Sequence, residues 1–145
     1  MMGFWPPYLG AGIRVKRISD DLTEIDVEMK LRFWNKNYVG THFGGSLYSM
    51  VDPFLMVMLI ENLGRDYIVW DKTAVIRFKR PGKGRVTAKF RLSKEEIESI
   101  RSKAMVEAKI EPQFKIEIID DSGQVIAEVE KTLYVKRKNS PSTKV

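Results

Sequence analysis

One acidic residue stands in an otherwise apolar stretch of the chain. Asp52 is the only acid between Glu28 and Glu61, and it is followed directly by Pro53. A buried carboxylate binds a proton more tightly than one in water, so it can act as a base near neutral pH. The Asp-Pro pair is also typical of a helix start, with the aspartate as N-cap and the proline in the first turn. The residues alone therefore leave a catalytic base and a helix cap as alternatives.

Several polar residues and glycines precede this aspartate in one short loop. The loop covers residues 35–45 and contains Asn37, His42 and the pair Gly44 and Gly45. Backbone N–H groups are free where a helix begins, so one of the glycines could donate to a carbonyl oxygen; the alternative is a tight turn with positive φ. His42 is either a general acid or a packed side chain. Asn37 either contacts a ligand or holds the turn.

A basic strip follows further along the chain. Residues 72–94 hold nine Lys and Arg residues and no acid, although the net charge of the whole chain is only +6. Such a local strip suits a polyphosphate ligand as well as a nucleic acid. The alternative is a solvated strand face, and nucleic-acid binding is disfavoured because only Phe78 and Phe90 interleave with the charges. The candidate phosphate ligands are Arg77, Lys79, Arg80, Lys83 and Arg85.

Composition excludes several kinds of site. The 145 residues suit one domain, and 43% hydrophobic with 30% charged residues is a globular composition. The absence of cysteine excludes a disulfide framework, a thiolate nucleophile and a cysteine zinc site, and a single histidine argues against any metal centre. The first nine residues lack the pattern of a secretory signal, and the longest apolar run, Pro53 to Ile60, is far shorter than the ~20 residues of a membrane span. We expect a cytoplasmic protein without a membrane partner.

The hydrophobic pattern predicts the elements that position these residues. Alternation over 13–18 and 25–33 predicts a hairpin. Residues 46–63 read as a helix that is apolar nearly all round, with a kink at Pro53, and such a helix must be covered on several sides. A second helix over 93–102 has Ser93 as its cap. Four further ranges have the alternation of strands: 67–79, 85–92, 105–119 and 124–136.

These elements predict one α+β domain over residues 1–136. Five or six antiparallel strands would curve around one long central helix, and residues 137–145 would form a disordered basic tail. Such a sheet has two exposed edges, which favours a homo-oligomer.

The loop and the helix start resemble the signature of the hotdog-fold acyl-CoA thioesterases. Residues 37–45 read Asn-Tyr-Val-Gly-Thr-His-Phe-Gly-Gly, and Asp52 follows seven residues later, as in the branch typified by the phenylacetate-pathway thioesterases. The stretch 73–81, which ends in Pro81, matches a later strand of that branch. Over about residues 10–136 the chain is also similar to a group of thioesterases first described as a domain of unknown function, whose members carry Gly-Thr-x-Phe-Gly-Gly.

The resemblance implies the hotdog fold and hydrolysis of an acyl-CoA thioester. Asp52 would be the base or nucleophile, and a backbone N–H at Gly44 or Gly45 the oxyanion donor. The sites would lie between subunits of a dimer or a dimer of dimers, with Thr73 reaching the site of the partner; its alternative role is that of an ordinary strand threonine. Coenzyme A would enter as part of the substrate, with no separate cofactor.

One position departs from the phenylacetate branch. Phe43 stands where that branch has histidine before Gly-Gly, and His42 lies one position earlier. This departure keeps a non-catalytic acyl-thioester or lipid binder as the alternative function. A hydratase or dehydratase of the same fold is disfavoured, because the pairing of histidine and acid that those enzymes use is not found.

Overall fold

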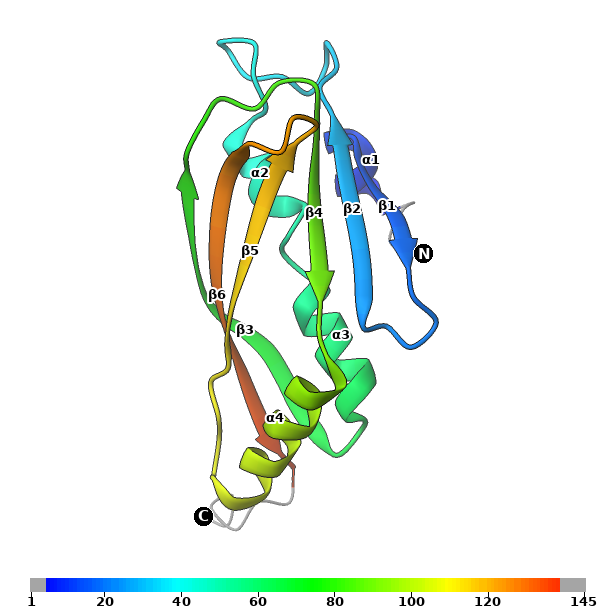
Figure 1. Cartoon of the computed structure of the whole chain (residues 1–145), viewed down its shortest axis with the longest axis vertical. Helices are drawn as coiled ribbons and strands as arrows, with labels where there is room; N and C mark the ends of the chain where they lie inside the picture. The colour runs from blue at the N-terminus through cyan, green and yellow to red at the C-terminus, as the bar shows by residue number, and fades with distance from the viewer. Residues whose placement is uncertain (1–4, 139–145) are drawn as a thin grey trace.

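A six-stranded antiparallel sheet forms the frame of the molecule, whose computed structural model describes residues 5–138 (Figure 1). The strands are β1 (Ile13–Ile18), β2 (Glu24–Lys30), β3 (Tyr67–Phe78), β4 (Arg85–Arg91), β5 (Gln113–Asp120) and β6 (Val125–Arg137). Their order across the sheet is β1-β2-β4-β5-β6-β3. Strands β1 and β3 are therefore the two edges, and β3 pairs along its whole length with β6 only.

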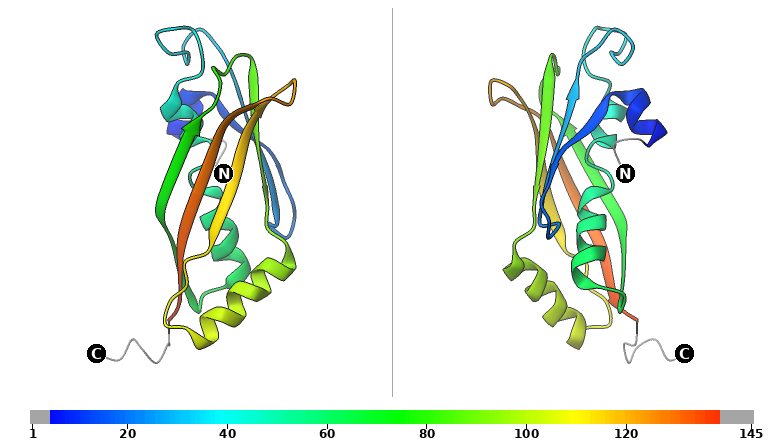
Figure 2. Two further views of the ribbon diagram at one scale, coloured as in Figure 1. Left: turned by 60° about the vertical axis from the view of Figure 1, so that its left-hand side comes forward. Right: turned by 90° about the vertical axis from the view of Figure 1, so that its right-hand side faces the viewer.

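The predicted central helix lies on one face of the curved sheet (Figure 2). It covers Gly44–Leu63 and consists of α2 (Gly44–Ser49), a turn, and α3 (Phe54–Leu63). The break falls at Pro53, as predicted, because proline has no N–H to continue the helix. By length and composition this segment could also cross a membrane, but here it supplies the core side chains that face the sheet. The core therefore lies between the central helix and the sheet.

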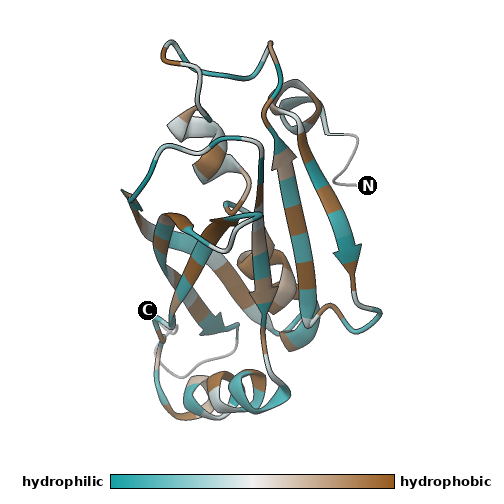
Figure 3. Ribbon diagram, turned by 45° about the horizontal axis from the view of Figure 1, so that its top comes forward, coloured by the Kyte–Doolittle hydropathy of each residue, from teal (hydrophilic) through white to brown (hydrophobic). Residues whose placement is uncertain are grey.

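Two shorter helices flank this core. Helix α1 (Pro6–Ala11) precedes β1, and α4 (Lys94–Val106) lies across one end of the sheet (Figure 2). Ser93 caps α4 as predicted, since its side chain accepts a hydrogen bond from Glu96 N at 3.1 Å. Strands β1 and β2 lie at one side of the sheet, and apolar residues alternate with polar ones along both (Figure 3). The alternation places the apolar side chains against the core.

The second strand ends earlier than predicted. We expected it to run to Phe33, but β2 ends at Lys30 and the Phe33 side chain is exposed. The buried side chain of Asn35 turns the chain at this point: its oxygen accepts from Arg32 N at 2.7 Å, and its amide donates to Lys30 O at 2.9 Å. Apolar and polar residues therefore alternate in the sequence as far as Phe33, although the strand pairing of β2 stops at Lys30.

The predicted strand over 105–119 is also too long. Helix α4 extends to Val106, because Ile97, Ile100 and Ala104 bury one helical face, and β5 begins only at Gln113. Before β5 the chain is joined to β6 by a bridge between Ile110 and Val135 and by a hydrogen bond from Leu133 N to Pro112 O at 3.0 Å. At the other end of the chain, Arg137 belongs to β6, and residues 139–145 of the predicted tail lie outside the described residues.

Candidate functional site

A groove of about 680 Å³ brings together many of the predicted site residues. One wall is the loop between β2 and α2 together with the start of α2, and the other is the turn between β3 and β4. The predicted site residues that line it are Asn37, His42, Gly44, Lys79, Arg80 and Lys83. Segments far apart in the sequence therefore meet here, at the end of the molecule that carries both loops (Figure 1).

Asn37 holds the loop together. Its side-chain oxygen accepts from Val39 N at 3.1 Å and Thr41 N at 2.9 Å, and its amide donates to the Thr41 hydroxyl at 2.9 Å. A further amide contact reaches His42 O at 3.3 Å. These hydrogen bonds hold the turn, which is one of the two roles that the sequence predicted for Asn37.

His42 is a buried wall of the groove. Its backbone N–H donates to Gly82 O at 2.9 Å, and its ring Nε2 donates to Gly84 O at 2.8 Å, so the residue ties the loop to the β3–β4 turn. The other ring nitrogen, Nδ1, is buried and has no partner within residues 5–138. Burial lowers the pKa of His42, although the bond to the Gly84 carbonyl opposes this. The ring is therefore neutral at pH 7, and it occupies the packed position that was the alternative to a general acid.

The two glycines at the start of α2 are packed against aromatic rings. A Cβ atom on Gly44 would lie 2.9 Å from the Phe78 ring, and one on Gly45 would lie 2.6 Å from the Phe43 ring. Neither has positive φ, so the predicted alternative of a tight positive-φ turn is wrong. Their N–H groups have no acceptor in the part of the chain that the structure describes, as expected at a helix start. These N–H groups are free to bind a carbonyl oxygen.

The five predicted phosphate ligands separate into two groups. Arg77 pairs with Glu130 at 3.2 Å, and Arg85 pairs with Asp121 at 3.2 Å, so both charges are already partnered outside the groove. The other three, Lys79, Arg80 and Lys83, line the groove and form no ion pair among residues 5–138.

Asp52 lies away from this groove, at the break in the central helix. Its side chain is 52% exposed in the single chain, so the burial that we predicted for it is not found. The hydroxyl of Tyr48, one turn earlier, donates to Asp52 Oδ1 at 3.2 Å. Asp52 precedes the proline but does not cap α3: the N-cap of that helix is Pro53, and no side chain caps it.

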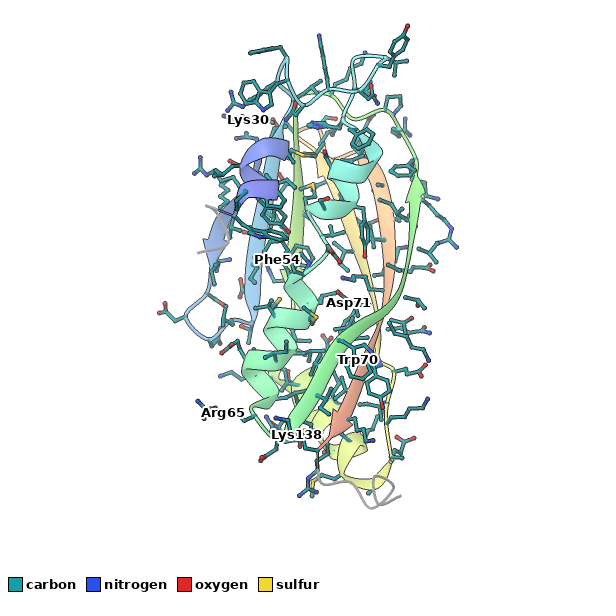
Figure 4. The ribbon with its side chains drawn as sticks, turned by 180° about the vertical axis from the view of Figure 1, so that it is seen from behind. Lys30, Phe54, Arg65, Trp70, Asp71 and Lys138 are labelled. Carbon is teal, nitrogen blue, oxygen red and sulfur yellow. The ribbon has the colours of Figure 1, made fainter. Side chains whose placement is uncertain are left out.

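A buried lysine from the sheet reaches this break. Lys131 on β6 is 0% exposed, and its Nζ lies 2.9 Å from Asp71 Oδ1 and 3.7 Å from Asp52 Oδ1. The same ammonium donates to the backbone carbonyl of Asp52. Asp71 comes from the middle of β3, on the side of the strand next to the central helix (Figure 4). The Oδ1 atom of Asp71 is buried without a hydrogen-bond partner among the described residues, and the ion pair with Lys131 compensates its charge.

Thr73 faces away from this cluster. It pairs with Thr132, which lies between the fully buried Lys131 and Leu133 and therefore points to the opposite face of the sheet. A bulge at Lys72 separates Thr73 from Asp71, which faces the helix. In the single chain it is thus Asp71, and not Thr73, that β3 presents to Asp52.

Sequence reasoning missed Lys131, Asp71 and the bond from Tyr48. A signal was available for the lysine: the inward positions of β6 are otherwise apolar, and a charge among them is unusual. The same holds for Asp71, which follows the inward Val69 by two residues.

Comparison with known proteins assigns the family. The family model described as a domain of unknown function, DUF4442, matches residues 1–135. The chain belongs to this family. A search of curated proteins found no match for this DUF4442 chain.

Solved structures share the fold of this DUF4442 protein at low identity. A protein of unknown function from Pseudomonas aeruginosa, described as a probable thioesterase, matches with a TM-score of 0.79 and 20% identity over 92% of this chain and 88% of its own. A thioesterase from Haemophilus influenzae matches with a TM-score of 0.64 and 15% identity, over 93% of this chain and 85% of its own. A mutant of the phenylacetic acid degradation protein PaaI from Thermus thermophilus matches with a TM-score of 0.60 and 17% identity, over 90% of this chain and 98% of its own. The predicted hotdog fold is confirmed.

Proposed function

We propose that this protein hydrolyses acyl-CoA thioesters, with Asp52 as the reacting carboxylate. The observation that carries the proposal is the carboxyl group of Asp52, which is half exposed at the break of an apolar helix and held by Tyr48 and Lys131. A charged group in such a place has no stabilising role as a helix cap. The fold shared with thioesterases adds support, as does the family.

Two routes are open to this carboxylate. It attacks the carbonyl carbon and expels the CoA thiolate, and water then hydrolyses the resulting acyl-aspartate anhydride. Alternatively it takes a proton from a water molecule that attacks the same carbon, and the proton passes to the leaving thiolate. In both routes the carbonyl oxygen becomes negatively charged, and the free N–H groups of Gly44 and Gly45 are suited to binding it.

Because Asp52 does not line the groove of its own chain, we propose that a complete site needs two chains. The groove and its glycines would come from one subunit and the carboxylate from the other. Strand β3 supports this arrangement. It is a twelve-residue edge strand whose outer side pairs with no strand of the described chain, and it exposes Trp70 and Val75. Pairing of two such edges would cover Asp52, which is exposed beside β3 in the single chain.

The groove has the charge that coenzyme A needs. Lys79, Arg80 and Lys83 are free to bind phosphate oxygens, and lysine and arginine bind phosphate with charge-assisted hydrogen bonds. The exposed rim of the groove would then hold the nucleotide end, while the thioester reaches the start of α2.

Release of free thiol from a panel of acyl-CoA esters tests the proposal. Asp52→Asn keeps the size and polarity of the side chain but removes the negative charge, so we expect hydrolysis to fall by at least about 100-fold. Glu61→Gln is the matched control, because Glu61 is an exposed acid on the same helix, and it should leave the rate unchanged. Equal rates in Asp52→Asn and wild type would contradict the assignment.

The alternative is a protein that binds acyl thioesters without cleaving them. It is favoured by His42, which is neutral and tied to Gly84, so that no histidine is free to assist the reaction. Calorimetry with a non-hydrolysable acyl-CoA analogue distinguishes the two functions: tight binding without any thiol release from the ester would identify a binding protein.

A further inference from the structure

The break in the central helix leaves backbone carbonyl groups that need donors. Pro53 has no N–H, so the helix cannot satisfy every carbonyl before it. The Ser49 carbonyl accepts a hydrogen bond from the Tyr8 hydroxyl at 2.7 Å, and the Asp52 carbonyl accepts one from the Lys131 ammonium. The backbone of Asp52 is therefore held in place from the sheet, by a lysine seventy-nine residues away in sequence.

Packing alone does not require a charged side chain at position 131. The other inward positions of β6 between Ala127 and Val135 hold Val129 and Leu133, and all are buried. An apolar side chain would fill the position of Lys131 without desolvating an ammonium, which is expensive unless the charge is paired. Here the charge is paired twice, with Asp71 at 2.9 Å and with Asp52 at 3.7 Å.

We propose that Lys131 and Asp71 form a positioning pair that orients the Asp52 carboxylate. This inference rests on the proposed function, because it concerns the carboxylate to which that function is assigned. Lys131 anchors the backbone of Asp52 and supplies a positive charge beside its side chain. Asp71 competes for that charge, so it sets how strongly the lysine acts on Asp52. Both residues act through Asp52 and are not catalytic residues themselves.

The titratable groups around this point come from four elements. They are Tyr8 on α1, Tyr48 and Asp52 on the central helix, Asp71 on β3 and Lys131 on β6. Burial, together with the charges of Asp52 and Asp71, raises the pKa of Tyr48 to about 12. Burial likewise raises the pKa of Tyr8. Both tyrosines therefore stay neutral at working pH, and Lys131 is the one cation of the group.

The two variants should affect kcat unequally. Lys131→Met removes both contacts to Asp52, whereas Asp71→Asn leaves the lysine and its bond to the Asp52 carbonyl in place. We therefore expect kcat to fall by less in Asp71→Asn than in Lys131→Met.

The separation of kcat from KM is a readout that a purely structural role would not give. Lys131→Met should lower kcat by about 10- to 100-fold with little change in KM, because the carboxylate loses its anchor while the groove that binds substrate is intact. Lys131→Arg keeps the positive charge and should recover part of kcat. Circular dichroism and thermal unfolding verify that each variant is folded.

A double variant covers the case in which Lys131→Met does not fold. Asp71→Asn combined with Lys131→Met leaves no buried carboxylate without its cation. Compared with Asp71→Asn alone, the double variant should again show a lower kcat, because the lysine that anchors the Asp52 carbonyl has been removed.

The outcomes separate this inference from the proposed function. If the wild type cleaves acyl-CoA and Asp52→Asn does not, the proposed function stands. A kcat that is then unchanged in folded Lys131→Met, or that Lys131→Arg does not recover at all, overturns the positioning pair alone. A wild-type protein that cleaves no acyl-CoA overturns the proposed function and the positioning pair together.

Discussion

The two turns that form the groove are joined through one imidazole. His42 donates to Gly84 from its ring and to Gly82 from its backbone, so its neutral form links the loop before α2 to the turn after β3. Protonation would place a charge in a buried position where Nδ1 has no partner in the described chain. The burial that lowers the pKa of His42 thus makes the folded state bind its proton more weakly than the unfolded state does.

Stability should therefore fall as the pH is lowered through the histidine range. The contribution of His42 is fully present above the ordinary histidine pKa of 6.5 and is lost as the pH falls toward its lower folded pKa. Urea unfolding at pH 7.5 and pH 5.5 measures this loss. His42→Gln should remove most of the difference, because His42 is the only histidine in the chain. A difference of the same size in the variant would contradict this origin.

Some of the predicted phosphate ligands form ion pairs with acids and others do not, and this difference should appear in the KM for acyl-CoA. Arg80→Gln removes a free groove cation and should raise the KM for acyl-CoA by about tenfold, the equivalent of one charge-assisted hydrogen bond. Arg77→Gln is the matched control, since Arg77 is paired with Glu130, and should change KM little. With an acyl-pantetheine ester, which lacks the nucleotide phosphates, both variants should resemble the wild type.

At this scale the sequence led to the groove residues but not to the cluster around Asp52. Asn37, His42, Gly44 and Asp52 were visible because their types are unusual in their surroundings. Asp71 and Lys131 stand as charges at inward positions of their strands, but their nearness to Asp52 depends on the pairing of β3 with β6, which no local pattern predicts. The bulge at Lys72 also changes which face Thr73 occupies, and the sequence hides this shift because the following residues, Val75 and Ile76, are both apolar.

Helix α4 is the element whose start depends most clearly on one side chain. The Ser93 hydroxyl oxygen accepts a hydrogen bond from Glu96 N at 3.1 Å, and the hydroxyl donates to the Glu96 carboxylate at 3.2 Å. Ser93→Ala should lower the free energy of unfolding by about 1 kcal/mol. The same change at Ser102, an exposed position within α4, is the control and should have a far smaller effect. Thermal or urea unfolding of the two variants makes the comparison, and equal losses would exclude a capping role.

Elements were predicted well where one signal dominated and poorly where two competed. The central helix, its break at Pro53 and the hairpin of β1 and β2 follow from periodicity and from proline chemistry. The end of β2 was missed because the buried Asn35 turns a chain whose alternation continues. The segment before β5 was missed because Met105 and Val106 read as strand, while the inward residues of α4 extend the helix past them.

The two edge strands of the sheet differ in length and in exposure. Strand β1 is short, but β3 is a long edge with exposed apolar side chains and, among the described residues, no covering element. Such edges pair readily with other strands, and a lysine placed on them prevents pairing. The oligomer that we propose should therefore depend on β3.

A charged residue on this edge should dissociate the oligomer. Val75 is 47% exposed on β3, and Val75→Lys is expected to yield monomers in analytical ultracentrifugation, since pairing would bring two such ammonium groups to the interface. Ile18→Lys is the control, because Ile18 is 49% exposed on β1, at the opposite edge of the sheet and outside the groove. Acyl-CoA hydrolysis should fall with the loss of the oligomer. An active Val75→Lys monomer would show that one chain suffices.

The distance of Asp52 from the groove of its own chain makes concentration a variable of catalysis. If each reaction centre is assembled from two copies, turnover per polypeptide is not a constant but declines on dilution below the dissociation constant of the pair. Expression level would then set output more steeply than in proportion to the amount of protein, and a cell holding few copies would have almost none of the activity.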